Sequence, residues 1–337
     1  MKIFMIGGTG LLGSEAAAEL IRRGHSVVSV ALPPIPAGAQ LPPAMELVLG
    51  NYMEMTDEEL LSHLKGCDGL VFAAGVDERV EGPPPIYALF KKFNITPLER
   101  LLRLAKQAGV KHAVVLGSYF VYFDRLWPGK QLSKWHPYVR SRADQETMAL
   151  SFADRAFDVA VLELPYIFGA QPGRKPVWVF LVEMIRGMKS RTYYPRGGTT
   201  MVTVKQVGQA IAGALEQNRG ANAYPIGYYN MKWTELLAII HKYMGMPGRK
   251  TVTVPDWMFT LGTRKIDKQR KAAGHEGGLR LDKLAAIQCA ELFIDKSLAS
   301  EPLGVQPDDI VAAIGQSIRL SVEVLDGKAQ AIGMKGE

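Results

Sequence analysis

The chain has 337 residues, of which 47% are hydrophobic and 22% charged, a composition typical of one large or two coupled globular domains. No apolar run approaches the ~18 residues of a membrane span, and the N-terminus reads directly into a strand pattern rather than a signal peptide. We therefore expect a soluble, cytoplasmic protein.

Cysteine, histidine and charge patterns argue against several classes of site. The two cysteines, Cys67 and Cys289, stand far apart and outside any CxxC pair, and the six histidines lack ligand spacing, so we expect neither a disulfide nor a metal. The net charge of +7 comes mostly from scattered basic residues. The one dense basic run, 264–271, contains no interleaved aromatic residue, which favours a solvated helix face over a nucleic-acid site.

Short apolar runs alternate with helical patterns in the first half of the chain. This alternation is typical of a parallel sheet covered by helices. The predicted strands are 2–6, 26–31, 46–49, 69–73, 111–117 and 157–164, and the predicted helices are 11–23, 56–64, 87–108 and 138–152. Six strands with intervening helices predict an α/β fold with a doubly wound, parallel Rossmann sheet.

The pattern loosens after Pro165, where glycine, proline and aromatic residues become frequent. Helices are predicted near 177–188, 204–217, 233–244 and 307–324. We expect a dinucleotide-binding Rossmann domain over 1–165 and a smaller, mainly substrate-binding subdomain over 166–330. Segments at about 200–230 are expected to return to the Rossmann core.

A glycine-rich turn follows the first predicted strand and opens the first predicted helix. It reads Gly7-Gly8-Thr9-Gly10-Leu11-Leu12-Gly13. Gly7 permits a tight turn, Gly10 lets the backbone approach a pyrophosphate, and Gly13 lets helix and strand pack closely. Because the pattern lies between a strand and a helix, it predicts that this turn binds a nicotinamide dinucleotide.

The end of the second predicted strand bears on the choice between NAD and NADP. It reads Val30-Ala31-Leu32-Pro33 and contains neither an acidic residue nor an arginine. An absent carboxylate removes both the usual bond to the ribose of NAD and the repulsion of a 2′-phosphate. We therefore expect NAD(P) with a lean to NADP, although no nearby cation is evident, and the choice stays open.

Several further motifs in the same order give the chain a family resemblance. They are Leu70-Val71-Phe72-Ala73-Ala74-Gly75, Gly117-Ser118-Tyr119-Phe120-Val121-Tyr122, Tyr138-Val139-Arg140-Ser141-Arg142, Leu164-Pro165-Tyr166-Ile167-Phe168-Gly169 and Leu303-Gly304-Val305-Gln306-Pro307. Together with the glycine-rich turn, they resemble the extended short-chain dehydrogenase/reductase family, also called the NAD-dependent epimerase/dehydratase family. The resemblance spans nearly the whole chain.

The resemblance implies roles for particular residues. Tyr138 would be the general acid or base at a substrate oxygen, Ser118 would polarise the carbonyl, and Asn94 would anchor a proton-relay water. The family's cofactor contacts would fall on residues at strand ends and on the tyrosine's helix. These are Asn51, Ala73, Ala74, Gly75, Arg142 and Pro165, beside Gly7, Thr9, Gly10, Leu11, Leu12 and Gly13 of the turn.

Position 142 departs from the family pattern, because it is arginine where the family has lysine. Tyr138 and Arg142 lie on one helix face at i and i+4 spacing. A phenol with a pKa near 10 needs an adjacent cation to act near neutral pH, and arginine keeps that charge. The planar guanidinium of arginine directs its N–H donors differently from the ammonium of lysine, so the exchange is not conservative. A plain surface pair is the alternative interpretation.

Other departures concern the substrate. Glu163 replaces an arginine common in members that use nucleotide sugars, Thr199 and Thr200 offer no guanidinium, and Gln206 replaces an aspartate. A diphosphate without guanidinium partners is poorly held in a desolvated site. We therefore expect a small, non-nucleotide substrate. The remaining arginines of this half are candidate anion contacts, although a place on the surface is favoured for each of them, namely Arg174, Arg191 and Arg196.

The residues leave three functions open. One is an NAD(P)-dependent oxidoreductase acting on a C–OH/C=O centre, with Tyr138 as acid or base and Arg142 beside it. A second, within enzymes, is an epimerase or dehydratase that oxidises transiently at the same site. A third is a dinucleotide-binding sensor that has lost efficient chemistry. A homodimer is a further expectation from the family.

Overall fold

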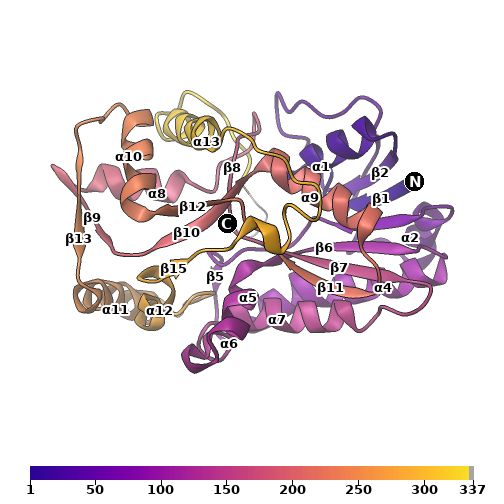
Figure 1. Ribbon diagram of the computed structural model, residues 1–337, viewed down its shortest axis with the longest axis horizontal. Helices are drawn as coiled ribbons and strands as arrows, with labels where there is room; N and C mark the ends of the chain where they lie inside the picture. Colours follow the sequence, from indigo (N-terminus) through magenta and orange to yellow (C-terminus); the bar gives the residue numbers. More distant parts are fainter. Residues whose placement is uncertain (334–337) are drawn as a thin grey trace.

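A seven-stranded parallel sheet forms the centre of the computed structural model, which describes residues 1–333. Across those residues, the strand order is β11-β7-β6-β4-β1-β2-β3. The predicted Rossmann sheet is confirmed (Figure 1). Its strands are β1 (Lys2–Ile6), β2 (Ser26–Ala31), β3 (Glu46–Leu49), β4 (Gly69–Phe72), β6 (His112–Ser118), β7 (Asp158–Leu164) and β11 (Ala221–Pro225).

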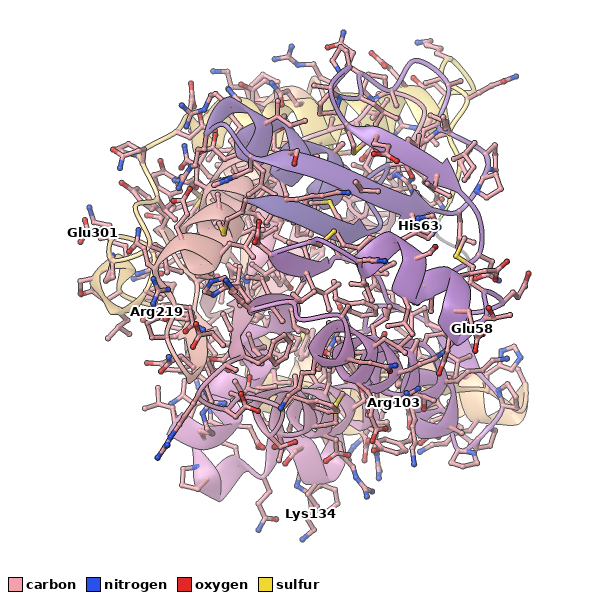
Figure 2. All side chains as sticks on the ribbon, turned by 90° about the vertical axis from the view of Figure 1, so that its right-hand side faces the viewer. Glu58, His63, Arg103, Lys134, Arg219 and Glu301 are labelled. Atoms are coloured by element: carbon pink, nitrogen blue, oxygen red, sulfur yellow. The ribbon has the colours of Figure 1, made fainter. Side chains whose placement is uncertain are left out.

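Helices cover both faces of this sheet. On one face lie α1 (Leu11–Arg22) and α9 (Val204–Gln217), and on the other lie α2 (Asp57–Leu64), α4 (Thr96–Gln107) and α7 (Pro137–Leu150) (Figure 1). Figure 2 shows the molecule from the right-hand side of Figure 1, where the Rossmann sheet lies. In this view Glu58 and His63 mark α2, and Arg103 marks α4. Because both faces are covered, the strands are apolar throughout rather than alternating.

The long helix predicted over 87–108 is interrupted. It consists of α3 (Tyr87–Phe90), a π-helical turn (Lys91–Ile95) and α4 from Thr96. Pro97 explains the interruption, since it has no N–H to donate and its ring crowds the preceding turn. The π-helical turn places Asn94 in the interior with no exposed surface.

Two elements of the Rossmann part were not predicted. The helix α5 (Tyr119–Leu126) follows β6 without a loop, and the Ser118 hydroxyl caps it by accepting a bond from the Phe120 N–H. The prediction of six strands is wrong by one, because β11 comes from the second half of the chain and pairs with β7 in parallel. Its sequence, Ala221-Asn222-Ala223-Tyr224-Pro225, lacks the β-branched residues typical of a buried strand.

The second half contributes a smaller body and also returns to the sheet. Its small sheets contain β8 (Tyr166–Phe168), β10 (Gly198–Thr203), β12 (Tyr229–Lys232) and β15 (Glu291–Leu292), and separately β9 (Arg191–Pro195) with β13 (Lys250–Val254). Its apolar cluster packs around the helices α8 (Val179–Gly187), α10 (Trp233–Tyr243) and α13 (Ile310–Leu325). Figure 1 shows this body beside the Rossmann sheet.

The basic run lies on α11 (Asp256–Ala272), and most of its side chains are exposed, as expected for a solvated helix face. After α11, the short strand β14 (Glu276–Gly277) pairs with β5 (Glu81–Gly82), which follows β4 in the chain. The segment therefore returns from the second half to the Rossmann part. No helix within the described part of the chain has the length and apolarity to cross a bilayer.

Candidate active site

The glycine-rich turn has the tight geometry that its sequence predicts. Gly7 has φ +94°, and a Cβ there would lie 2.5 Å from the Ala73 carbonyl oxygen at the end of β4. A Cβ on Gly13 would lie 2.2 Å from the Gly7 carbonyl oxygen. Both positions therefore require glycine. Gly10 differs, because its φ is −78° and a Cβ would approach only the Gly7 carbonyl oxygen, at 3.2 Å.

The N-terminus of α1 is suited to binding an anion. Gly10 is the N-cap, no side chain caps the helix, and its first turn contains no acidic residue. The N–H groups of Leu11, Leu12 and Gly13 are thus left for a ligand at the positive end of the helix dipole. A pyrophosphate matches this charge and hydrogen-bonding pattern. The residues present fit a dinucleotide cofactor.

The end of β4 lies beside this turn and is held by Asn94. The Asn94 side chain accepts a hydrogen bond from the Val76 N–H at 2.8 Å and donates one to the Val76 carbonyl at 3.1 Å. Gly75 has φ +132°, and a Cβ there would meet the Asn94 Oδ1 at 2.5 Å. Asn94 therefore fixes the loop in which Ala73, Ala74 and Gly75 lie, and its role at a relay water stays a prediction.

Tyr138 and Arg142 are a buried pair on α7, not a surface pair. Their exposed fractions are 4% and 8%, and the Arg142 Nε donates to the Tyr138 hydroxyl oxygen at 3.1 Å. The phenol proton has no acceptor among residues 1–333 and is left for a ligand. Burial raises the pKa of Tyr138, while the Arg142 charge and its hydrogen bond lower it.

Arg142 is locked in place by the protein. Its Nη1 donates to the Leu116 carbonyl at 3.3 Å and to the Gln145 side chain at 2.8 Å, and its Nη2 donates to the Val76 carbonyl at 3.2 Å. Gln145 in turn donates to the Asn94 carbonyl at 2.7 Å. With the bond to Tyr138, four of the five guanidinium N–H groups are used. The fifth N–H has no acceptor among residues 1–333.

Ser118 lies at the carboxyl end of β6, in the neighbourhood of Tyr138. It is 4% exposed, and the ring of Phe120, two residues later, packs edge-on against Tyr138 with 6.4 Å between ring centroids. Pro165 is buried directly after β7. Asn51 follows the edge strand β3, and its side chain is used in a local turn, bonding to Glu54 and the Met53 N–H.

Glu78 is a functional candidate that the motifs do not contain. Burial, and next the charge of Asp77, raise the pKa of Glu78 to about 7, although Arg142 and Arg79 oppose the shift. Its negative charge in turn raises the pKa of Tyr138. A carboxyl that titrates near neutrality beside a candidate acid is typical of active sites. The sequence signal that could have identified Glu78 is an acidic residue in the segment 76–80, shortly after β4.

A segment from the second half closes over Tyr138. The Tyr138 N–H donates to the Gly278 carbonyl at 3.0 Å. A Cβ on Gly278 would lie 2.7 Å from the Glu78 carbonyl oxygen and 3.0 Å from the Tyr138 Cβ. The backbone after β14 therefore lies directly against both residues, and only glycine fits there.

Three of the positions that depart from the nucleotide-sugar pattern have structural partners, while the Thr200 hydroxyl is buried without a hydrogen-bond partner among residues 1–333. Glu163 is fully buried, and both of its carboxylate oxygens accept bonds from the Arg125 Nη2 at 2.9 Å. Burial raises the pKa of Glu163 to about 8. Thr199 bonds to the Tyr119 hydroxyl at 3.0 Å, and Gln206 forms a capping box with Thr203 at the start of α9.

Comparison with known proteins identifies the first half of the chain. Residues 7–163 match a protein-family model described as NAD(P)H-binding. The match begins at Gly7 and ends at Glu163 in β7. It thus covers the glycine-rich turn, the end of β4, Ser118 and the Tyr138–Arg142 pair.

Curated relatives extend the similarity beyond this domain. A protein of Synechocystis sp. (strain ATCC 27184 / PCC 6803 / Kazusa) named "Putative dihydroflavonol 4-reductase" is 22% identical over 338 residues, covering 94% of this chain and 93% of the relative. A protein of Stigmatella aurantiaca named "4-hydroxy-2-methyl-3-oxo-4-farnesyl-3,4-dihydroquinoline-1-oxide ketoreductase" is 24% identical over 236 residues, covering 66% of this chain and 67% of the relative. Both carry the name of a reductase.

Among solved structures, MoeE5 in complex with UDP-glucose and NAD matches with a TM-score of 0.65 and 19% identity, covering 96% of this chain and 100% of that chain. At that identity the match establishes the fold. The part of the motif-based resemblance that concerns an NAD(P)-binding Rossmann domain is thereby confirmed. The chain contains an NAD(P)H-binding domain at residues 7–163, and over most of its length it has the fold of MoeE5.

Proposed function

We propose that the protein is an NAD(P)-dependent oxidoreductase that interconverts a carbonyl and an alcohol on a small, non-nucleotide substrate. The observation that carries this proposal is the buried bond from Arg142 to the Tyr138 hydroxyl, which leaves the phenol proton free for a substrate oxygen. Reductase names among the relatives support the reaction class. The absence of arginine at 163, 199 and 200 supports a substrate without a diphosphate.

The chain's residues divide the work as follows. The N–H groups at the start of α1 would hold the cofactor pyrophosphate, and the free N–H of Arg142 would donate to a ribose hydroxyl. When bound, the nicotinamide supplies or accepts the hydride at the substrate carbon. In the reductive direction, Tyr138 transfers its proton to the carbonyl oxygen, and Arg142 stabilises the resulting phenolate. Ser118 donates to the same oxygen.

A substrate panel tests this proposal. The purified protein is mixed with NADPH or NADH and with aldehydes, ketones and alcohols, together with UDP-glucose as the nucleotide-sugar control, and absorbance at 340 nm is followed. We expect turnover with at least one non-nucleotide carbonyl and none with UDP-glucose. Tight cofactor binding with no turnover on any compound would instead identify a dinucleotide sensor.

Two substitutions of Arg142 separate the effect of its charge from the effect of its hydrogen-bond geometry. Arg142→Lys keeps the charge beside Tyr138 but cannot reproduce four planar hydrogen bonds, so we expect kcat to fall less than about tenfold, with a loss of about 1–3 kcal/mol in unfolding free energy. Arg142→Met removes the charge, and kcat should fall by about 100-fold or more. Equal kcat values for the two variants would show that the charge is not used.

Glu78 offers a prediction about pH. Since its carboxylate raises the pKa of Tyr138, Glu78→Gln should lower that pKa. Reduction needs the protonated phenol, so its loss at alkaline pH should begin at lower pH in Glu78→Gln than in the wild type. Below about pH 6, where the Glu78 carboxyl with its pKa of about 7 is already protonated, the two proteins should behave alike. The kcat–pH profile measures this, and coincident profiles at high pH would contradict it.

A further inference from the structure

Arg174 lies against the glycine-rich turn, although it comes some 160 residues later in the chain. Its Nη2 donates to the Thr9 carbonyl at 3.4 Å, and its Nε donates to the Gln171 side chain at 3.0 Å. Gln171 itself donates to the Thr9 carbonyl at 3.2 Å and to the Ser14 hydroxyl at 3.1 Å. Arg174 is thus half-buried against the turn, because the loop after β8 folds back onto it.

The same loop also touches the segment that follows β2. Gly173 packs so closely on Ala37 that a Cβ would lie 2.2 Å from the Ala37 carbonyl oxygen, and Pro172 lies 3.6 Å from the Cβ position of Gly38. The loop therefore bridges the glycine-rich turn and residues 37–38, in the segment that follows β2. In a Rossmann sheet the adenosine ribose is recognised at the end of β2, where this segment begins. From Ala31 to Met45 the sequence supplies no charged residue of its own.

The guanidinium of Arg174 has spare donors and no acidic partner. Three of its five N–H groups have no acceptor, and it forms no ion pair with any carboxylate, among the residues that the structure describes. Burial lowers its pKa, which reflects the cost of holding this charge away from water. It also stands beside the positive N-terminus of α1, so the two repel unless an anion joins them.

We propose that Arg174 binds the 2′-phosphate of NADP(H) and makes the protein selective for NADP(H) over NAD(H). This inference rests on the proposed cofactor-binding function and specifies it. The cation that the end of β2 lacks comes from the loop after β8 instead. A guanidinium with three free donors can bind a phosphate in bidentate fashion. Arg191, by contrast, is exposed on β9, and Arg196 is paired with Asp256.

Binding measurements separate the 2′-phosphate from the rest of the cofactor. Calorimetry with NADPH, NADH, 2′,5′-ADP and 5′-AMP is run on the wild type, Arg174→Gln, Arg174→Lys and the exposed-charge control Arg191→Gln. We expect the wild type to bind 2′,5′-ADP at least about tenfold more tightly than 5′-AMP, with a matching preference for NADPH over NADH, as two charge-assisted hydrogen bonds imply. Arg174→Gln should lose both preferences while binding NADH within about threefold of the wild type.

The other variants distinguish the possible negative results from one another. Arg174→Lys should keep part of the preference, and Arg191→Gln all of it. If Arg174→Gln weakens NADH and NADPH equally, the arginine acts on the pyrophosphate or the turn, and the assignment to the 2′-phosphate is overturned. A wild type without preference overturns it too, while cofactor binding stands. If the wild type binds none of the dinucleotides, the proposed function itself fails. Melting temperatures of all variants exclude misfolding.

Discussion

Tyr138→Phe is expected to lower kcat by about two to four orders of magnitude and to leave the dissociation constants of NADH and NADPH within about threefold. The range is that of a single general acid or base in the transition state. The phenol is the one group of the buried pair that keeps a proton for the substrate, whereas the Arg142 guanidinium stays charged. Steady-state kinetics on the best compound of the panel, with calorimetry for the cofactors, measures both quantities.

This substitution also removes the acceptor of the Arg142 Nε, so part of any loss could come from destabilisation. An unpaired buried donor costs about 1–3 kcal/mol. Tyr119→Phe is the matched control, because it removes the hydroxyl of another buried tyrosine, bonded to Thr199. It should cost similar stability without a comparable loss of kcat. Equal kcat losses in both variants, or none in Tyr138→Phe, would contradict the assigned role.

Gly10→Ala should abolish tight cofactor binding in a protein that still folds. Gly10 has an ordinary φ, and its Cβ would meet only one backbone oxygen, so we expect the unfolding free energy to change by about 1 kcal/mol or less. The added methyl group would stand where the pyrophosphate approaches the N–H groups of α1. Losing two charge-assisted hydrogen bonds predicts that Kd rises about 100-fold or more.

Gly13→Ala provides the contrast within the same turn. Its Cβ would lie 2.2 Å from the Gly7 carbonyl oxygen, so α1 must move away from β1 and stability should fall by about 1–3 kcal/mol or more. Thermal melts with and without NADPH therefore separate the two glycines. If Gly10→Ala binds both dinucleotides as the wild type does, the turn does not hold the pyrophosphate.

Local signals explain what the sequence predicts well. The apolar runs of β1, β2 and β4 and the glycine spacing of 7–13 depend on neighbours in the chain, and their positions agree with the structure within a residue or two. The helix α2 begins as its capping box dictates, with Thr56 and Glu59 exchanging hydrogen bonds. Tyr138 and Arg142 pair because helical spacing alone brings them together.

Contacts between distant segments explain what the sequence does not reveal. The short strand β11 is stabilised by pairing with β7 and not by its own residues. Arg174 looks like one scattered arginine until the loop after β8 is placed on Thr9. Glu78 acquires its raised pKa only from burial beside Asp77. The first two depend on contacts between segments far apart in sequence, and Glu78 likewise packs against the distant segment around Gly278.

The origin of β11 has a consequence for how the chain is made. Until Pro225 leaves the ribosome, the edge of β7 that faces away from β6 has no partner strand, because residues 221–225 pair with 159–163. An unpaired strand edge on a nascent chain is a template for aggregation. A gene fragment ending near Pro165 would keep the whole glycine-rich turn and Tyr138, yet we expect it to accumulate in inclusion bodies rather than as a small working dehydrogenase.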